Sequence, residues 1–221
     1  MNADPTTDNK ASAHALGKPT ADFTIRDFLR ATGDKQPVPG GGTVAAVTGA
    51  LAAALARMVV SFSKGKKSQA ENQDLYEELD ATLTRAADLL LALADEDAAA
   101  YAEFRRLSSL PEDHPDRAEN YAAAALAIAT VPLSIAGTAS EILAHIEPLA
   151  GRSNPWLRSD LAIAAALART AASAAHHNVT VNIDTLSSLG LGHGFREEAD
   201  KCLEDAESAA KRIEKACAQG W

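Results

Sequence analysis

At 221 residues the chain has the length of one ordinary domain, and its 47% content of hydrophobic residues excludes a disordered chain. Its formal net charge of −9 argues against general binding to nucleic acid, because such proteins neutralise phosphates with Lys and Arg. Aromatic residues make up only 5%, and much of the apolar content is alanine, the strongest helix former. We therefore expect an all-α fold.

The first 20 residues are polar and lack the apolar centre of a secretory signal. We expect a disordered tail over 1–20, a single helical domain over 21–221 and a cytoplasmic location. A short amphipathic helix is predicted over 24–32, and the proline- and glycine-rich stretch 34–42 should end it.

Apolar periodicity predicts five further helices, over 43–63, 74–107, 116–149, from 159 to at least 175, and 195–218. Pro132 should kink the third of these, because proline removes one hydrogen bond of the helix and clashes with the preceding turn. After residue 175 the run HHNVTVNIDTL fits a helix or an extended segment. The pattern as a whole indicates a bundle of about six helices with long, kinked and alanine-rich members.

One predicted helix approaches the length of a membrane span. Between Val44 and Phe62 the only charged residue is Arg57. An arginine inside a span costs about 2.5–3.5 kcal/mol even on lenient insertion scales, and the segment is mostly alanine. We interpret it as a buried core or interface helix and expect no membrane partner.

Asp97 interrupts the apolar stripe of the long helix predicted over 74–107. Its neighbours on that stripe, Leu90, Leu93, Tyr101 and Phe104, lie within roughly 40° of it around the helix axis. Burial of a carboxylate raises its pKa and suits it to general acid/base work. The alternative is a structural ion pair with a buried base such as Arg169 or Arg57.

Three glycines, Gly40, Gly41 and Gly42, precede Thr43 and lead into a helix. Glycines allow close approach of the backbone, and a helix N-terminus offers free N–H groups to an anionic or carbonyl group. The alternative is a tight turn. The preceding residues do not form a strand, which argues against a dinucleotide fingerprint.

Other polar residues have both structural and functional interpretations. Lys64, with Lys66 and Lys67, forms a basic patch that either attracts a polyanionic tail or is a solvated loop. Ser159 and Asp160 are typical of a helix start.

Asn178 and Asn182, four residues apart, would share a helix face and could bind a flat heterocycle. His176 and His177 adjoin them, but no third ligand stands at metal-binding spacing, and Cys202 and Cys217 are too few for a metal cluster, so we expect no metal.

The segment PVPGGGTVAAVTGALAAALARMVVSFSKGKK resembles the start of the cyclodeaminase domain of formiminotransferase-cyclodeaminases, and equally the stand-alone bacterial methenyltetrahydrofolate cyclohydrolases. Further similarities follow in the same order: DEDAAAY at 95–101, Leu110-Pro111, Val131-Pro132-Leu133, Asn154, Ser159-Asp160 and NVTVNID at 178–184. The resemblance covers about residues 24–185.

This resemblance implies an all-helical homodimer with a folate site near the subunit contact and without a metal or nucleotide cofactor. It implies Asp97 as the acid/base and Asp160 as a second catalytic carboxylate that helps to bind the pterin. The substrate-binding residues that it implies are Gly40, Gly41, Gly42, Thr43, Lys64, Lys67, Asn154, Asn178 and Asn182.

The expected activity is that of a methenyltetrahydrofolate cyclohydrolase, which interconverts methenyl- and formyl-tetrahydrofolate. The alternative is a formimino-tetrahydrofolate cyclodeaminase, which releases ammonia. The sequence carries no fused formiminotransferase domain, and this favours the cyclohydrolase. A third hypothesis is a non-catalytic, folate-binding helical oligomer, which the presence of Asp97 and Asp160 disfavours.

Overall fold

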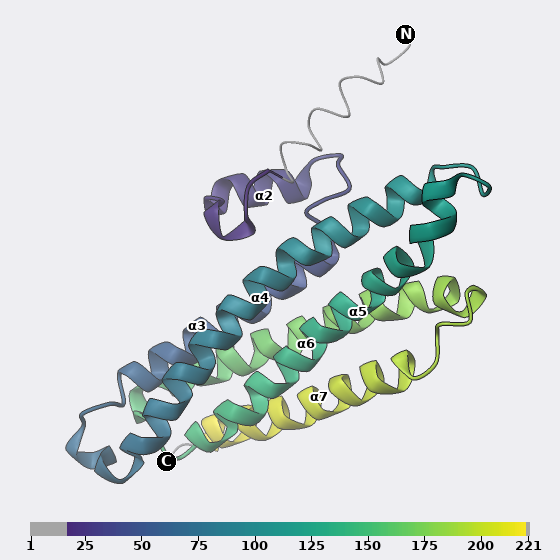
Figure 1. The fold of residues 1–221 in the computed structure, drawn as a ribbon. Coiled ribbons are helices and arrows are strands. Elements are labelled where there is room, and N and C mark those ends of the chain that lie inside the picture. The colour runs from purple at the N-terminus through teal and green to yellow at the C-terminus, as the bar shows by residue number, and fades with distance from the viewer. Residues whose placement is uncertain (1–16, 220–221) are drawn as a thin grey trace.

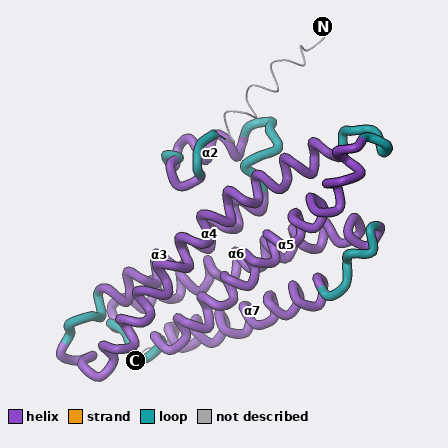
Figure 2. Tube along the Cα trace, viewed as in Figure 1, coloured by secondary structure: helices purple, strands orange, loops and turns teal. Residues whose placement is uncertain are grey.

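A computed structural model describes residues 17–219 of the chain, and this part is helical without strands (Figures 1 and 2). The α-helices are α2 (Ile25–Gly33), α3 (Gly41–Ser61), α4 (Gln73–Ser108), α5 (Pro115–Ile146), α6 (Arg158–Ser188) and α7 (Phe195–Gln219). Short 3₁₀ turns lie at Thr20–Asp22, Lys67–Asn72, Glu147–Leu149 and Pro155–Leu157. The predicted all-α class is confirmed.

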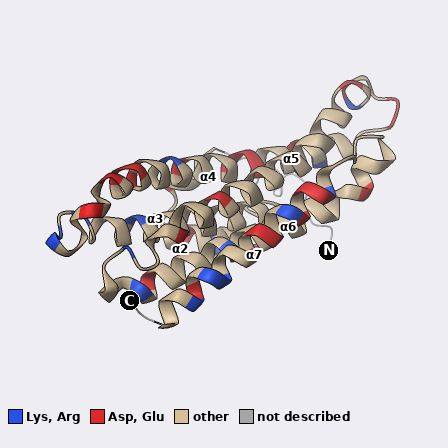
Figure 3. Ribbon diagram, turned by 90° about the horizontal axis from the view of Figure 1, so that it is seen from below, with Lys and Arg blue, Asp and Glu red and all other residues tan. Residues whose placement is uncertain are grey.

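Helices α3, α4, α5 and α6 form an elongated bundle in which consecutive helices run in opposite directions (Figure 1). Helix α3 packs against α4 and α6, and α5 packs against the same two helices from the other side. Helix α7 lies along α5 and α6, while α2 stands apart from the bundle near the start of α3. Charged residues lie mainly on the outside, and acidic ones are frequent on α4 (Figure 3).

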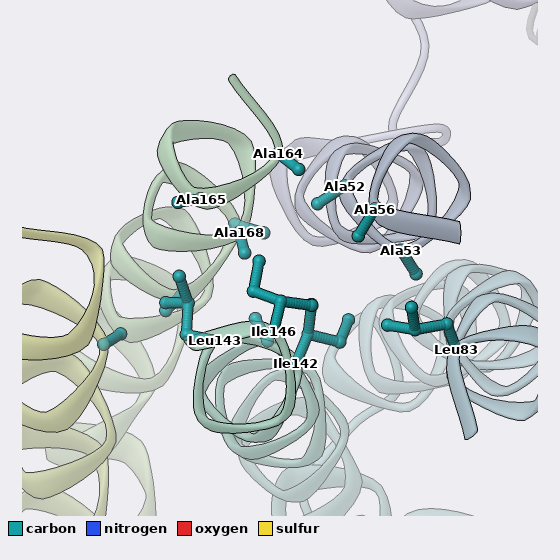
Figure 4. Close-up of a cluster of buried hydrophobic side chains, with 14 of the residues drawn as sticks. Ala52, Ala53, Ala56, Leu83, Ile142, Leu143, Ile146, Ala164, Ala165 and Ala168 are labelled. Carbon is teal, nitrogen blue, oxygen red and sulfur yellow. The ribbon is translucent and has the colours of Figure 1, made fainter. Parts of the chain in front are cut away.

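Alanine lets the helices approach closely in the core. Fully buried alanines of α3 and α6, among them Ala52, Ala56 and Ala168, face isoleucines and leucines of the neighbouring helices (Figure 4). At Gly49 the neighbouring helix approaches so closely that a Cβ added there would lie 3.0 Å from Cδ1 of Leu90. Small side chains on one helix thus pack against larger ones on the next, which is how protein interiors become closely packed.

Two helices are long and apolar enough to cross a membrane by length and composition alone, α3 and the stretch Pro115–Leu149. In each of them at least half of the most apolar window is buried inside the protein. Burial against neighbouring helices accounts for this apolar character.

The ambiguous run at 176–186 is helical and continues α6. Val179, Ile183 and Leu186 are its buried residues, and their spacing of four and three places them on one helix face. Packing on the bundle therefore outweighs the modest helix propensity of β-branched residues.

Helix α5 is continuous through Pro132. Proline has no N–H, so the carbonyl of Ile128, four residues earlier, loses its usual donor. The Nδ2 group of Asn182 on α6 donates to this carbonyl at 2.8 Å. A side chain from the neighbouring helix thus replaces the missing backbone hydrogen bond.

Residues 1–16 of the tail predicted over 1–20 lie outside the described residues. Of the remaining four, Thr20 is held against α4. Its backbone N–H and its hydroxyl both donate to Oδ1 of Asp95, at 2.8 and 2.6 Å.

Candidate active site

A pocket of about 250 Å³ lies where the first turn of α3 meets α4, α5 and α6. We call it the glycine pocket, after the three glycines in its wall. Its other functional side chains come from α4 and α6. The residues that carry its chemistry are Gly40, Gly41, Gly42, Asp97, Asn178 and Asn182, and Tyr101, Pro132 and Val181 lie beside them.

The carboxylate of Asp97 lies directly against the backbone of Gly42. A Cβ added at Gly42 would be 2.1 Å from Oδ1 of Asp97, closer than any side chain can approach. Only glycine fits this position while the carboxylate stays in place. A tight turn is therefore not the main reason for this glycine, which makes room for Asp97.

Thr43 hydrogen-bonds to the same carboxylate. Its hydroxyl donates to Oδ2 of Asp97 at 3.1 Å, and its backbone N–H also donates to the carboxylate. Burial raises the pKa of Asp97 above its ordinary value, and the two bonds from Thr43 partly oppose that rise. The result is a carboxyl group that exchanges a proton at a higher pH than a solvated aspartate.

The alternative interpretation of Asp97 as half of a structural ion pair is wrong. Arg57 pairs with Asp80 at 2.6 Å, and Arg169 with Glu214 at 3.5 Å. Between residues 17 and 219 no salt bridge includes Asp97. No base among the described residues therefore neutralises its charge, and burial is the largest influence on its pKa.

The N-terminus of α3 adds further polarity to the pocket. Gly40 is the residue before the helix, and no side chain caps it. The first N–H groups of a helix have no partner inside it and carry a partial positive charge. Anionic or carbonyl groups of a ligand can therefore be bound beside Asp97.

Asn178 and Asn182 lie on one face of α6 and line the pocket together. Nδ2 of Asn178 donates to the carbonyl of Ala174 at 2.9 Å, and Nδ2 of Asn182 donates to the carbonyls of Ile128 and Asn178. Both donors of Asn182 and one donor of Asn178 are thus engaged, so the groups that remain for a ligand are the two Oδ1 acceptors and one N–H of Asn178. Such acceptors suit a heterocycle that presents N–H donors.

A second cavity, of about 390 Å³, adjoins the glycine pocket. It lies between α4 and the segment that carries Thr20 and α2, and we call it the phenylalanine pocket. Val38, which precedes a cis proline, lines both cavities. The other residues that matter for its chemistry are Lys18, Phe23, Phe28, Thr43, Asp95 and Ala99.

This second cavity was not among the sites predicted from the sequence. Its lining comes from four separate stretches of chain, and the residues are mostly small or apolar types without a motif. No motif in the sequence therefore marks it.

The remaining predicted site residues lie near the end of α3 and the start of α6, away from the first turn of α3. Figure 1 shows these helix ends at the opposite end of the bundle. Lys64 and Lys67 follow the last turn of α3, which at 21 residues spans about 30 Å. Asn154 and Asp160 lie beside the first turn of α6, whereas Asn178 lies five turns further along. Within one subunit these four residues are therefore not part of the glycine pocket.

Local contacts explain part of this distant group. Lys64 pairs with Asp80 at 2.9 Å. Asn154 is buried, receives the N–H of Trp156 on its Oδ1 and donates its own backbone N–H to Ser63. Asp160 lies in the first turn of α6, where the helix dipole favours an acid, but no side-chain cap closes this helix.

Among residues 17–219 no three His, Cys, Asp or Glu side chains are grouped so that they could hold a metal ion. Nε2 of His176 lies 2.6 Å from Oδ1 of Asp200 on α7 and so connects two helices. Burial raises the pKa of both cysteine thiols. These residues stand away from the glycine pocket.

Comparison with known proteins gives a consistent assignment. The formiminotransferase-cyclodeaminase family matches residues 24–201. A formimidoyltransferase-cyclodeaminase from Sus scrofa is 32% identical over 201 residues, which are 86% of this chain and 36% of that protein. The chain thus spans about a third of the length of that relative.

A shorter relative is matched over nearly its whole length. The methenyltetrahydrofolate cyclohydrolase of Methylorubrum extorquens is 30% identical over 86% of this chain and 93% of its own. The crystal structure of a formiminotetrahydrofolate cyclodeaminase from Thermotoga maritima superposes with a TM-score of 0.83 at 25% identity, over 90% of this chain and 98% of that one. The family match covers the glycine pocket and most of the bundle, and the chain belongs to the formiminotransferase-cyclodeaminase family.

Proposed function

We propose that this protein is a methenyltetrahydrofolate cyclohydrolase and that Asp97 is its general acid/base. The observation that carries the proposal is a partly buried carboxylate with a raised pKa, held by Thr43 against the Gly42 backbone and without a cationic partner among residues 17–219. A relative from Methylorubrum extorquens whose length matches this chain is a cyclohydrolase by name and supports the proposal.

The reaction adds water to a carbon that bridges two nitrogens and transfers a proton from that water to one of the nitrogens. Water attacks the methenyl carbon between N5 and N10 of the folate, and the Asp97 carboxylate accepts a proton from that water. The protonated Asp97 then donates to N5 as the bond between carbon and N5 breaks. The remaining hydroxyl proton leaves to solvent, so one water is consumed, 10-formyl-tetrahydrofolate forms and one proton is released. Positioned acid/base catalysis of this kind contributes about 10²–10⁴-fold.

The asparagine pair would orient the pterin. The ring carries an exocyclic amino group and ring N–H groups, and these donors complement the Oδ1 acceptors of Asn178 and Asn182. Asn182 is fixed by its bond to the Ile128 carbonyl. Preorganised acceptors hold the ring without reorganisation when the reaction begins.

The cyclodeaminase reaction is the second candidate, supported by the names of the Sus scrofa and Thermotoga maritima proteins. Here N10 attacks the formimino carbon on N5, and protonated Asp97 would donate to the nitrogen that leaves as ammonia. The same pocket and the same carboxyl group serve both reactions.

The two reactions are distinguished by incubating the protein separately with methenyl- and formimino-tetrahydrofolate. The cyclohydrolase loses the absorbance of the methenyl group without releasing ammonia, whereas the cyclodeaminase gains that absorbance and releases ammonia. The proposal expects the first result. Turnover of formimino-tetrahydrofolate alone would replace it with the second candidate, and binding without turnover would establish a folate-binding protein.

A homodimer is the proposed working form, and an apolar face of α3 and α6 supports it. Ile163 and Val181 are large, exposed and 18 residues apart, so they project from the same side of α6. Leu51 and Phe62 share a side of α3 in the same way. We call these four residues and Trp156, which is 88% exposed, the α3/α6 face.

The occupant that we propose for this face is a second copy of the chain. Helix α3 carries a single charged residue, Arg57, and exposed apolar residues gathered on one side of a protein are typical of interaction sites. The apolar residues run from Trp156 at one end of the bundle to Val181 beside the glycine pocket, so two antiparallel copies would cover one another along the full length.

An antiparallel dimer would also bring the two separated groups of predicted residues together. Each subunit's Trp156 end would approach the other subunit's Val181 end. Asp160 and Lys67 would then lie close to the partner's glycine pocket, where Asp160 could contact the pterin.

A further inference from the structure

We propose that the phenylalanine pocket binds the aminobenzoyl-glutamate half of the folate, so that the substrate lies across both cavities with its reacting carbon between them. The proposal rests on the proposed function, because it assigns the rest of the same substrate. It adds a binding site from residues outside the glycine pocket.

The first argument is the position of Thr43 and Asp97 between the two cavities. Thr43 lines the phenylalanine pocket, Asp97 lines the glycine pocket, and the two are hydrogen-bonded to one another. Val38 lines both cavities. In a tetrahydrofolate the one-carbon unit bridges the pterin and the aminobenzoyl group, so the reacting carbon also lies between two flat halves. A pterin in the first cavity directs the other half past Thr43 into the second.

The second argument is size. The glycine pocket, at about 250 Å³, is smaller than the ~300–1,000 Å³ of sites that enclose a whole drug-sized ligand. The phenylalanine pocket adds about 390 Å³, and the two together fall within that range. The glycine pocket alone is therefore too small to enclose a complete folate, whereas the two cavities together are large enough.

The chemistry of the walls is different in the two cavities. The glycine pocket offers a carboxylate and two amides, whereas Phe23 and Phe28 offer the second cavity two half-buried aromatic rings. Aromatic rings pack well on a flat aryl group such as aminobenzoyl. The polar half and the aryl half of the substrate thus each find a matching wall.

Lys18 supplies the charge that a glutamate requires. It is exposed at the rim of the phenylalanine pocket, with Nζ 5.3 Å from the centre of the Phe23 ring. Asp95 also lines this cavity, but its Oδ1 accepts both hydrogen bonds of Thr20 and so fixes the segment that carries Lys18. An ammonium group above an aromatic wall suits an aryl ring that ends in carboxylates.

The test uses a variant that fills the phenylalanine pocket. Ala99 lines it from the exposed side of α4, and Ala92, seven residues earlier on the same side of the helix, does not. Ala99→Trp should raise KM for methenyl-tetrahydrofolate at least tenfold and abolish the binding of free 4-aminobenzoyl-glutamate, observed by ligand NMR. Ala92→Trp should leave both at wild-type values, and circular dichroism verifies that both variants fold.

A second variant addresses the glutamate alone. Lys18→Ala changes an exposed side chain and should reduce the affinity for 4-aminobenzoyl-glutamate several-fold while leaving the affinity for 4-aminobenzamide, which lacks carboxylates, unchanged. Equal binding of both fragments by Lys18→Ala and wild type would remove Lys18 from the site.

The outcomes separate this inference from the proposed function. Turnover by the wild type together with normal KM and fragment binding in Ala99→Trp would overturn the inference and leave the cyclohydrolase assignment intact. A wild type that turns over neither folate yet binds 4-aminobenzoyl-glutamate in a way that Ala99→Trp abolishes would support the cavity and contradict the enzyme.

Discussion

At the scale of single residues, Gly42 and Asp97 depend on one another. The carboxylate occupies the space that any larger residue at position 42 would need. Because the displaced group would be the end of a flexible side chain, the backbone need not move. The glycine therefore matters for the position of the carboxylate much more than for the stability of α3.

Replacing Gly42 with alanine tests this dependence. Gly42→Ala should reduce kcat by at least about 100-fold, the lower range for loss of a positioned acid/base, while the free energy of unfolding changes little. Gly137→Ala on α5 is the matched control, because a Cβ there meets nothing within 4 Å. It should keep full activity and gain about 0.5–1 kcal/mol of stability from the lower entropy of the unfolded chain. Equal activities of the two variants would contradict the account.

Thr43 sets the pH at which Asp97 becomes ionised. Burial raises the pKa of Asp97, and the hydrogen bonds from Thr43 lower it, so removing the hydroxyl raises that pKa further. In Thr43→Val the acidic limb of the kcat/KM profile should move to higher pH, because the carboxylate forms later as the pH rises. Thr43→Ser keeps the donor and should restore the wild-type profile. An unshifted limb in Thr43→Val would show that Asp97 does not control it.

Asp97 was predictable from the sequence because a carboxylate within an apolar helical stripe is costly without a role. Its partners were not, because Thr43 and Gly42 are more than 50 residues away and carry no signal of contact with it. The separation of Lys64 from the glycines follows from helix length alone, since 21 residues span about 30 Å. The family resemblance assigned Lys64 and the glycines to one substrate site, but the length of α3 keeps them apart within one chain.

At the scale of helices, the bond between Asn182 and the Ile128 carbonyl joins α6 to α5 where Pro132 interrupts the backbone pattern. Periodicity predicted the existence of both helices but left residues 176–186 open, because β-branched runs suit either structure. Only the packing of Val179 and Ile183 against the bundle decides for the helix.

A double-mutant cycle measures this connection. Asn182→Ala leaves the carbonyl of Ile128 without a donor and should cost about 1–3 kcal/mol in the free energy of unfolding. Pro132→Ala restores a backbone N–H for the same carbonyl, so Asn182→Ala should cost clearly less in that background. Chemical denaturation of the four proteins gives the coupling energy. Strict additivity would mean that Asn182 does not compensate for the proline.

At the scale of the whole molecule, the proposed dimer forms through the α3/α6 face. Ile163 on this face and Leu89 on α4 are exposed to almost the same extent, 50% and 49%. Ile163→Glu should yield a monomer with little activity, because it places a charge in the proposed contact. Leu89→Glu should remain a dimer with normal activity. Sedimentation measures both, and a wild type that is monomeric at working concentration would remove the dimer proposal.

The central claim is that Asp97 transfers the proton at the bridging carbon of the folate. Its most direct test is the turnover of methenyl-tetrahydrofolate by wild-type protein and by Asp97→Asn, with folding of the variant verified by circular dichroism. The account predicts that folded Asp97→Asn still binds the folate but loses about 10²–10⁴-fold in kcat. Near-normal turnover by that variant would contradict it.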